Sequence, residues 1–89
     1  MSIYAVNKVC RRVVHEPELR RALAEAPEEA LRAARPPLTD EEIRCLLAGD
    51  VGRLGRMGAN HFLLHQLGRF HLLGLDLPLY AERIRAAYR

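Results

Sequence analysis

Residues 38–43 read Leu38-Thr39-Asp40-Glu41-Glu42-Ile43, the pattern of a helix N-terminus. The Thr39 hydroxyl can accept a hydrogen bond from the third backbone N–H of the helix, and the Glu42 carboxylate can reach back to the N–H of Thr39. Leu38 and Ile43 can close over this capping box as a hydrophobic staple. The stretch therefore predicts a helix that begins sharply just after Thr39.

The residues around this stretch continue the helical pattern. Gly49 is expected to end the helix in the left-handed conformation, and Asp50 to cap the next one. Upstream, apolar residues recur at helical spacing rather than at the two-residue spacing of a strand, and they predict a helix from Ser2 or Ile3 to His15. These apolar positions are Ile3, Val6, Cys10 and Val13.

Prolines and glycines divide the rest of the chain into further helices. Pro17 is expected in the first turn of a second helix, and Pro27 before one or two additional turns. We expect the longest helix between Ala59 and Leu73, with one apolar side for the core and a second, partly apolar side, which indicates either a central helix or one that also meets a partner. Its core side would carry Leu63, Leu64, Leu67 and Phe70, and its other side His61, His65, Arg69 and Leu72. A last helix would begin near Pro78 and stop at Arg89.

Length and composition indicate one small all-α domain over residues 1–89, a compact bundle of about five to six short helices around one longer helix. The chain has 89 residues, of which 49% are hydrophobic but only 6% aromatic, with no Trp. Such a core must consist of Leu and Ala, which favours helices over strands. No apolar run approaches the ~20 residues of a membrane span, and the N-terminal Met1-Ser2-Ile3-Tyr4 lacks the charged and apolar regions of a signal peptide. We therefore expect a cytoplasmic protein that does not enter a membrane.

The charge pattern and the cysteines point to few special sites. The net charge is +3, but acidic residues are interleaved with the arginines at helical spacing, as in surface ion pairs. Cys10 and Cys45 are expected to be buried free thiols rather than a disulfide. Gly52, Gly55 and Gly58 are interpreted as sites of close helix approach, with anion binding by Arg53 and Arg56 as the alternative.

No combination of residues in the sequence makes a complete active site. His61 and His65 lie one helical turn apart, but two ligands are too few for a zinc or iron site, and His71 lies on another face of the helix. Ser2 is the sole serine, and Cys10 falls in the stripe expected to be buried, where a thiol is inert. We assign no catalytic residue, metal ligand or cofactor to this chain. Asn7 is expected either to bracket another backbone segment or to make a functional contact. The candidates for contact with a partner or a pocket are Asn7, Asn60, His61, Phe62, His65 and Arg69.

An ordered set of residues resembles a known family. The set consists of Asn7-Lys8-Val9-Cys10, Arg20 and Arg21, the Leu38-Thr39-x-Glu41-Glu42 helix start, Asp50, Leu54 and Gly58-Ala59-Asn60. In order and spacing these elements resemble the small α-subunit family of protocatechuate 4,5-dioxygenase, the LigA-like domain, over roughly residues 4–74.

The resemblance implies a small helical domain that pairs with a larger subunit of a type II extradiol dioxygenase. In that family the larger chain holds ferrous iron and cleaves a catecholic ring with dioxygen, while the helical subunit covers the cleft. We therefore expect a larger dioxygenase subunit as the partner, or a homo-oligomer in its place. The alternatives are a peptide- or protein-recognition module unrelated to ring cleavage and a small nucleic-acid binder that uses Arg53, Arg56 and Arg69.

Overall fold

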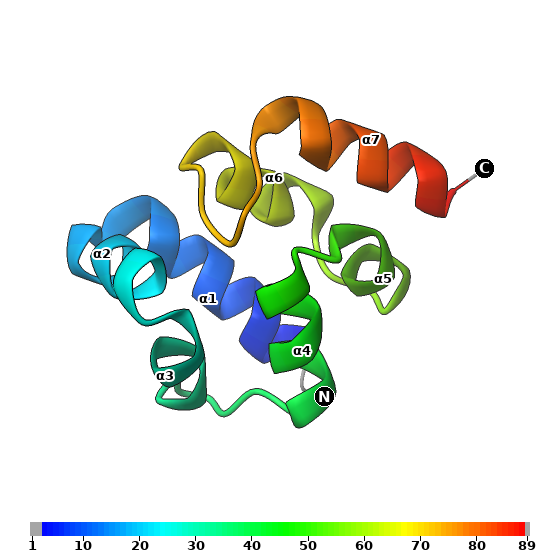
Figure 1. Cartoon of the computed structure of the whole chain (residues 1–89). Helices are drawn as coiled ribbons and strands as arrows, with labels where there is room; N and C mark the ends of the chain where they lie inside the picture. Colours follow the sequence, from blue (N-terminus) through cyan, green and yellow to red (C-terminus); the bar gives the residue numbers. More distant parts are fainter. Residues whose placement is uncertain (1–2, 89) are drawn as a thin grey trace.

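The computed structural model describes residues 3–88, which form seven helices and no strand (Figure 1). The all-α class predicted from the composition is confirmed. The helices are α1 (Ile3–His15), α2 (Pro17–Glu25), α3 (Pro27–Arg32), α4 (Asp40–Ala48), α5 (Val51–Arg56), α6 (His61–Arg69) and α7 (Leu77–Ala87). The proposed helix start at Ser2 and the stop at Arg89 lie outside the described residues.

The helix boundaries at the centre of the chain form as the sequence predicts. The Glu42 N–H donates to Thr39 Oγ1 at 3.1 Å, and the Thr39 N–H donates to Glu42 Oε1 at 2.9 Å, so the capping box before α4 is complete. Gly49 ends α4 with a φ of +66°, and the Asp50 carboxylate accepts the Arg53 N–H at the start of α5. Each of these boundaries is a local interaction, which is why the sequence reveals it.

One hydrophobic cluster holds the seven helices together, and α1 runs through the middle of the molecule (Figure 1). The inner side of α1 carries the predicted apolar stripe, of which Val6, Cys10 and Val13 are fully buried. α2 and α6 pack directly against α1, while α3 and α4 continue from α2, and α7 packs on α5 and α6. Leucines from all the other helices except α7 complete this core, as the low aromatic content requires.

The expected long helix over residues 59–73 is wrong, because α6 ends at Arg69 and the longest helix is α1, with 13 residues. His71 adopts a left-handed φ of +57°. Its N–H donates to the Gly68 carbonyl and the Leu72 N–H donates to the Leu67 carbonyl, at 3.1 and 2.9 Å. This pair of bonds is the Schellman arrangement that usually requires glycine. The sequence has histidine at this position, so no glycine marks residue 71 as the end of the helix, and the end could not be predicted.

The early end of α6 changes which residues face the core. Leu72, expected on the outer side of a long helix, turns inward and is buried together with Leu75. Gln66 is also buried, and its amide donates to the Phe62 carbonyl at 3.4 Å while its Oε1 accepts from Arg69 at 3.2 Å. The helix is therefore shorter than predicted and is followed by a folded-back turn, and it packs against α1 on one side and α7 on another, as a central helix does.

Two of the three spaced glycines allow close packing. A Cβ on Gly52 would lie 2.7 Å from the Ala87 Cβ of α7, and one on Gly55 would lie 2.8 Å from His61 Nε2. The neighbours of Gly55 are side-chain atoms of His61 and Tyr88. The prediction of close backbone approach is confirmed at Gly52, where the Arg83 carbonyl oxygen would lie 3.0 Å from the Cβ. It is wrong at Gly58, where a Cβ would meet nothing within 4 Å and a φ of +108° instead identifies a turn residue after α5.

Both cysteines are free and buried, as predicted. Desolvation raises the pKa of the Cys10 thiol to about 12, and burial also raises the pKa of Cys45. Cys10 thus acts as a small apolar core residue and not as a nucleophile. Of the seven helices described, none has the length and apolar character needed to span a membrane.

Candidate functional site

A hydrogen bond between residues 53 positions apart joins α1 to the start of α6. The Asn60 N–H donates to Asn7 Oδ1 at 2.9 Å, and the Asn60 side chain in turn caps α6 by accepting the Leu63 N–H at 3.2 Å. Asn7 is therefore a bracket to another backbone segment, one of the two roles expected for it. The bond fixes the spacing between the two helices at the molecular surface.

Beside this bond lies an elongated depression, which we call the α1–α6 groove. It consists of two adjoining hollows of about 340 and 160 Å³ that share Arg11, Asn60 and Leu63. Its lining is formed by Tyr4, Asn7, Lys8, Arg11, Val14, His15, Asn60, Phe62 and Leu63. Helix α1 supplies one wall, and the first turn of α6 with its capping residue supplies the other.

Two large aromatic side chains of this groove face solvent. Phe62 is 72% exposed and Tyr4 is 60% exposed, the highest values among the large hydrophobic residues of the described chain. Phe62 carries no polar atom on its side chain, so its exposure gains nothing in hydration. Exposed apolar side chains that gather at one groove are typical of an interaction surface, whereas single scattered ones are not.

The groove is positively charged. Neither α1 nor α6 contains an Asp or Glu, and Lys8 and Arg11 make no ion pair with any residue between 3 and 88. The nearest carboxylate in sequence, Glu16, is occupied by Arg12, which donates two hydrogen bonds to it at 2.9 and 3.0 Å. These bonds lower the pKa of Glu16. The two groove cations thus remain available to an acidic ligand.

His61 and His65 connect α6 to α7 and do not line the groove. His61 Nε2 lies 3.1 Å from the Tyr88 hydroxyl, and the Tyr80 hydroxyl donates to the His61 carbonyl at 2.8 Å. The His65 ring packs edge-on against Tyr80, with ring centroids 5.4 Å apart. Both histidines therefore have structural neighbours on the C-terminal helix.

Arg69 lies at the opposite end of α6 from Asn60. Its guanidinium donates to Gln66 and lies over the Phe70 ring, 5.2 Å from the centroid. The Arg20 guanidinium lies over the same ring at 4.5 Å. Of the six candidate residues, the structure therefore brings Asn7, Asn60 and Phe62 together in one groove, and it places His61, His65 and Arg69 elsewhere.

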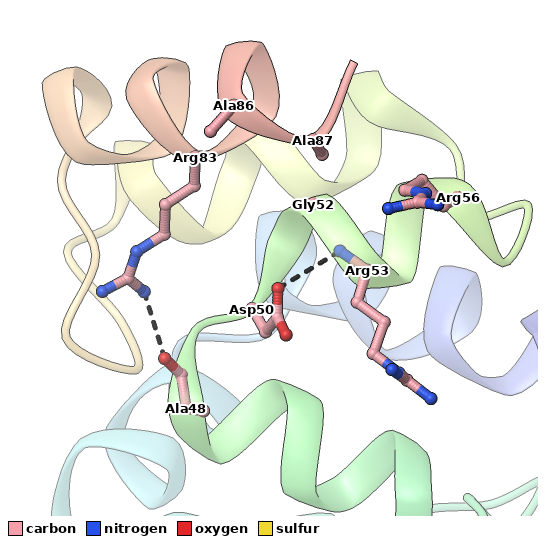
Figure 2. A pocket seen from close by; sticks show the side chains of 8 residues that line it. All are labelled: Ala48, Asp50, Gly52, Arg53, Arg56, Arg83, Ala86 and Ala87. Carbon is pink, nitrogen blue, oxygen red and sulfur yellow. Dashed lines mark hydrogen bonds between the residues drawn. The ribbon is translucent and has the colours of Figure 1, made fainter. Parts of the chain in front are cut away.

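A second hollow, of about 580 Å³, lies between α5, α7 and the end of α4 (Figure 2). Three arginines line it, which raises the possibility of anion binding suggested by the sequence. Figure 2 shows, however, that Arg83 points toward the Ala48 carbonyl, whereas Arg53 extends away from it, with Asp50 between them. Arg83 donates to the Ala48 and Gly49 carbonyls at 3.0 and 2.7 Å, and Arg53 pairs with Glu41.

These contacts favour close packing over anion binding at the second hollow. The guanidinium groups of Arg53 and Arg83 diverge and already have partners, and the Asp50 carboxylate repels an incoming anion. Only Arg56, of the three lining arginines, forms no such contact with residues 3–88. Gly52 forms part of the lining and accommodates Ala87 of α7. Arg83 secures the end of α4, a favourable role for a cation near C-terminal carbonyls.

The sequence prediction missed six of the nine groove residues, four of which are Tyr4, Lys8, Arg11 and His15. A signal for them exists, because Tyr4, Lys8, Arg11 and His15 recur at intervals of four, three and four residues and so share one face of α1. All four are exposed. The apolar stripe on the opposite face of the helix is the stronger sequence pattern. The stripe of Tyr4, Lys8, Arg11 and His15 therefore looks like an ordinary solvent-exposed face.

The groove presents groups suited to binding. Within residues 3–88, no three His, Cys, Asp or Glu side chains lie close enough to share a metal ion. The groove holds cations, amides and aromatic rings, which recognise acidic and apolar groups. Comparison with known proteins found no matching family model, curated protein or solved structure.

Proposed function

We propose that this chain is a small non-catalytic subunit, or a stand-alone relative of one, that docks onto the larger iron-bearing chain of an extradiol ring-opening dioxygenase. In this proposal the chain contributes a surface that covers the partner's active-site cleft. The surface is the α1–α6 groove with its exposed aromatic side chains.

The Asn7–Asn60 hydrogen bond is the observation that carries the proposal. Asn7 belongs to the Asn-Lys-Val-Cys element of the resemblance and Asn60 to the Gly-Ala-Asn element, and the bond brings both to one surface. The third element is the capping box of α4, which the structure forms in full. Two elements that are weak signals in isolation thus share one contact in this fold, which supports the proposal.

Ferrous iron belongs to the partner in this proposal. Residues 3–88 offer no set of three side chains that could hold iron, so we derive no catalytic step within this chain. Its own residues bind and orient, with Phe62 and Tyr4 as apolar anchors and Lys8 and Arg11 as charged contacts. An interface of standard size buries roughly 800 Å² on each partner.

Co-expression with the large subunit of a type II extradiol dioxygenase tests the proposal. We expect the two chains to co-elute in size-exclusion chromatography and the mixture to open a catechol faster than the large subunit alone. Oxygen uptake and the absorbance of the ring-opened product measure the rate. A chain that stays monomeric beside a dioxygenase encoded by a neighbouring gene contradicts the proposal, as does ring opening by the purified small chain alone.

A second candidate function is a peptide- or protein-recognition module that serves a different client through the same groove. The exposure of Phe62 and Tyr4 favours this candidate equally, because it identifies an interaction surface without identifying the partner. Specific recovery of a modifying enzyme with the wild-type chain, and loss of that enzyme with Phe62→Asp, would distinguish it from the dioxygenase subunit.

A further inference from the structure

The outer face of α1 offers a straight, continuous contact line. Tyr4, Lys8, Arg11 and His15 lie along it, and all four side chains are exposed. The line spans eleven residue steps, or about 16 Å at 1.5 Å per step. A partner helix of roughly three turns has the same length.

The segments that form this side of the chain contain no Asp or Glu, and the nearest carboxylate in sequence, Glu16, is paired with Arg12. All 11 Asp and Glu residues fall within residues 16–50 and 76–82, and none falls within residues 3–15 or 51–75. The two acid-free segments supply both walls of the α1–α6 groove. An approaching acidic segment therefore meets Lys8 and Arg11 without a repelling carboxylate among the lining residues.

Apolar groups lie beside these cations. Phe62 and Leu63 extend from the start of α6, and Val14 and Tyr4 from α1. A ligand that satisfies both sets of groups needs an apolar stripe flanked by carboxylates. A charged group alone would leave Phe62 exposed, and an apolar group alone would leave the cations unpaired.

We propose that the groove binds an acidic amphipathic helix of the partner protein, aligned with α1. Its apolar stripe packs between Tyr4 and Phe62, and its carboxylates pair with Lys8 and Arg11. This inference deepens the proposed function, on which it rests for the identity of the partner. Residues 3–88 contain no strand, so no sheet edge is available to pair with an extended peptide, and the groove between two helices suits a helical ligand.

The positive charge of the groove is too small to favour nucleic acid as the ligand. Proteins that bind duplexes through the backbone commonly neutralise about 6–10 phosphates, whereas this groove presents two unpaired cations, Lys8 and Arg11. Aromatic groups at the groove could stack on bases, so binding of an oligonucleotide is an outcome that the experiment must include.

The test uses the full chain and a fluorescein-labelled synthetic helix of roughly 14 residues, with Leu at positions i, i+3, i+4 and i+7 and Glu on the flanks. Fluorescence anisotropy measures its affinity at low and high salt. We expect Lys8→Glu with Arg11→Glu to weaken binding about tenfold or more. The matched control, Arg21→Glu with Arg44→Glu, makes the same change in net charge at exposed positions outside the groove and should change affinity less than about twofold. Thermal melts monitored by circular dichroism verify that both variants fold.

Several results would overturn the inference. The first is an equal loss of affinity for the acidic helix in the two double variants. The second is equally tight binding of a peptide with Lys in place of Glu. The third is tighter binding of a single-stranded or duplex oligonucleotide than of the acidic helix. The proposed function is tested separately with the dioxygenase large subunit. If the acidic helix binds but no dioxygenase subunit does, this inference holds and the proposed function fails. If the large subunit binds, and neither the charge reversal at Lys8 and Arg11 nor added salt changes its affinity, the proposed function holds and this inference fails.

Discussion

Cys10, in the middle of the core, links the stability of the protein to alkaline pH. Burial raises its pKa from an ordinary value of 9.0 to about 12. Between these values the folded chain retains a proton that the unfolded chain releases, so the free energy of unfolding falls as pH rises. Desolvation raises the pKa of Tyr80 as well, which adds to the loss above its ordinary value of 10.0.

We therefore expect stability to decline above pH 9, with Cys10 contributing about 1 kcal/mol per pH unit. Urea unfolding at pH 8, 9 and 10 measures this slope. Cys10→Ala should be less stable at pH 8 because it removes a buried sulfur, yet its stability should fall less steeply with pH. Parallel slopes in the two proteins would show that the thiol does not contribute.

His71 carries backbone strain at the end of α6. Its φ of +57° is a left-handed conformation, which glycine adopts at little cost and other residues do not. We expect His71→Gly to be about 1 kcal/mol more stable than His71→Ala, because both lose the imidazole but only glycine relieves the backbone. Chemical denaturation of the two variants provides the comparison, and equal stabilities would contradict it.

At the level of elements, Gly52 sets the distance between α5 and α7. An alanine Cβ at this position would lie 2.7 Å from the Ala87 Cβ and 3.0 Å from the Arg83 carbonyl oxygen. We expect Gly52→Ala to destabilise the protein by about 1–3 kcal/mol through overpacking. The double variant Gly52→Ala with Ala87→Gly should recover part of this loss, since it removes the closer contact. A cycle of four denaturation curves measures the coupling, and strict additivity would contradict the packing argument.

The link between α1 and α6 depends on a single side-chain acceptor. Asn7→Ala leaves the Asn60 N–H without its partner, and we expect a loss of about 1 kcal/mol in the free energy of unfolding. Asn7→Asp preserves an oxygen at this place and should lose less. Urea titrations of both variants test this. Equal losses would mean that the hydrogen bond contributes nothing.

Local signals explain which elements could be predicted from the sequence. The starts of α4 and α5 and the glycine end of α4 depend on contacts within a few residues, and all of them were predictable. The end of α6 was not, because His71 adopts a conformation for which glycine is the usual signal. Gly58 was misinterpreted for a related reason, since the sequence shows a glycine but not whether a neighbouring helix lies against it.

The residues of the candidate site show the same difference between local signals, which a sequence reveals, and long-range contacts, which it does not. Asn7, Asn60 and Phe62 could be named individually, but the hydrogen bond that brings Asn7 to Asn60 spans 53 positions and leaves no local trace. The contacts of His61 with Tyr88 and of His65 with Tyr80 also join residues far apart in sequence, so the structural roles of these histidines emerged only with the fold. Arg69 was separated from the groove by the length of α6.

At the scale of the whole molecule, charge and exposed apolar surface coincide. The acid-free segments form one groove, and the two most exposed large hydrophobic side chains, Phe62 and Tyr4, lie beside it. The described chain has an accessible surface of 5338 Å². A standard interface of roughly 800 Å² would cover about 15% of it. Docking of a partner would therefore bury a large fraction of the accessible surface of so small a protein.

Phe62 provides the most direct test of whether this groove is where the protein acts. Light scattering with size-exclusion chromatography should detect a complex between the chain and the dioxygenase large subunit. We expect Phe62→Asp, which places a carboxylate among the exposed apolar groups, to abolish that complex. Leu77→Asp, a matched change at a residue 42% exposed outside the groove, should leave it intact. A complex that survives Phe62→Asp, or that Leu77→Asp weakens to the same extent, would contradict the account.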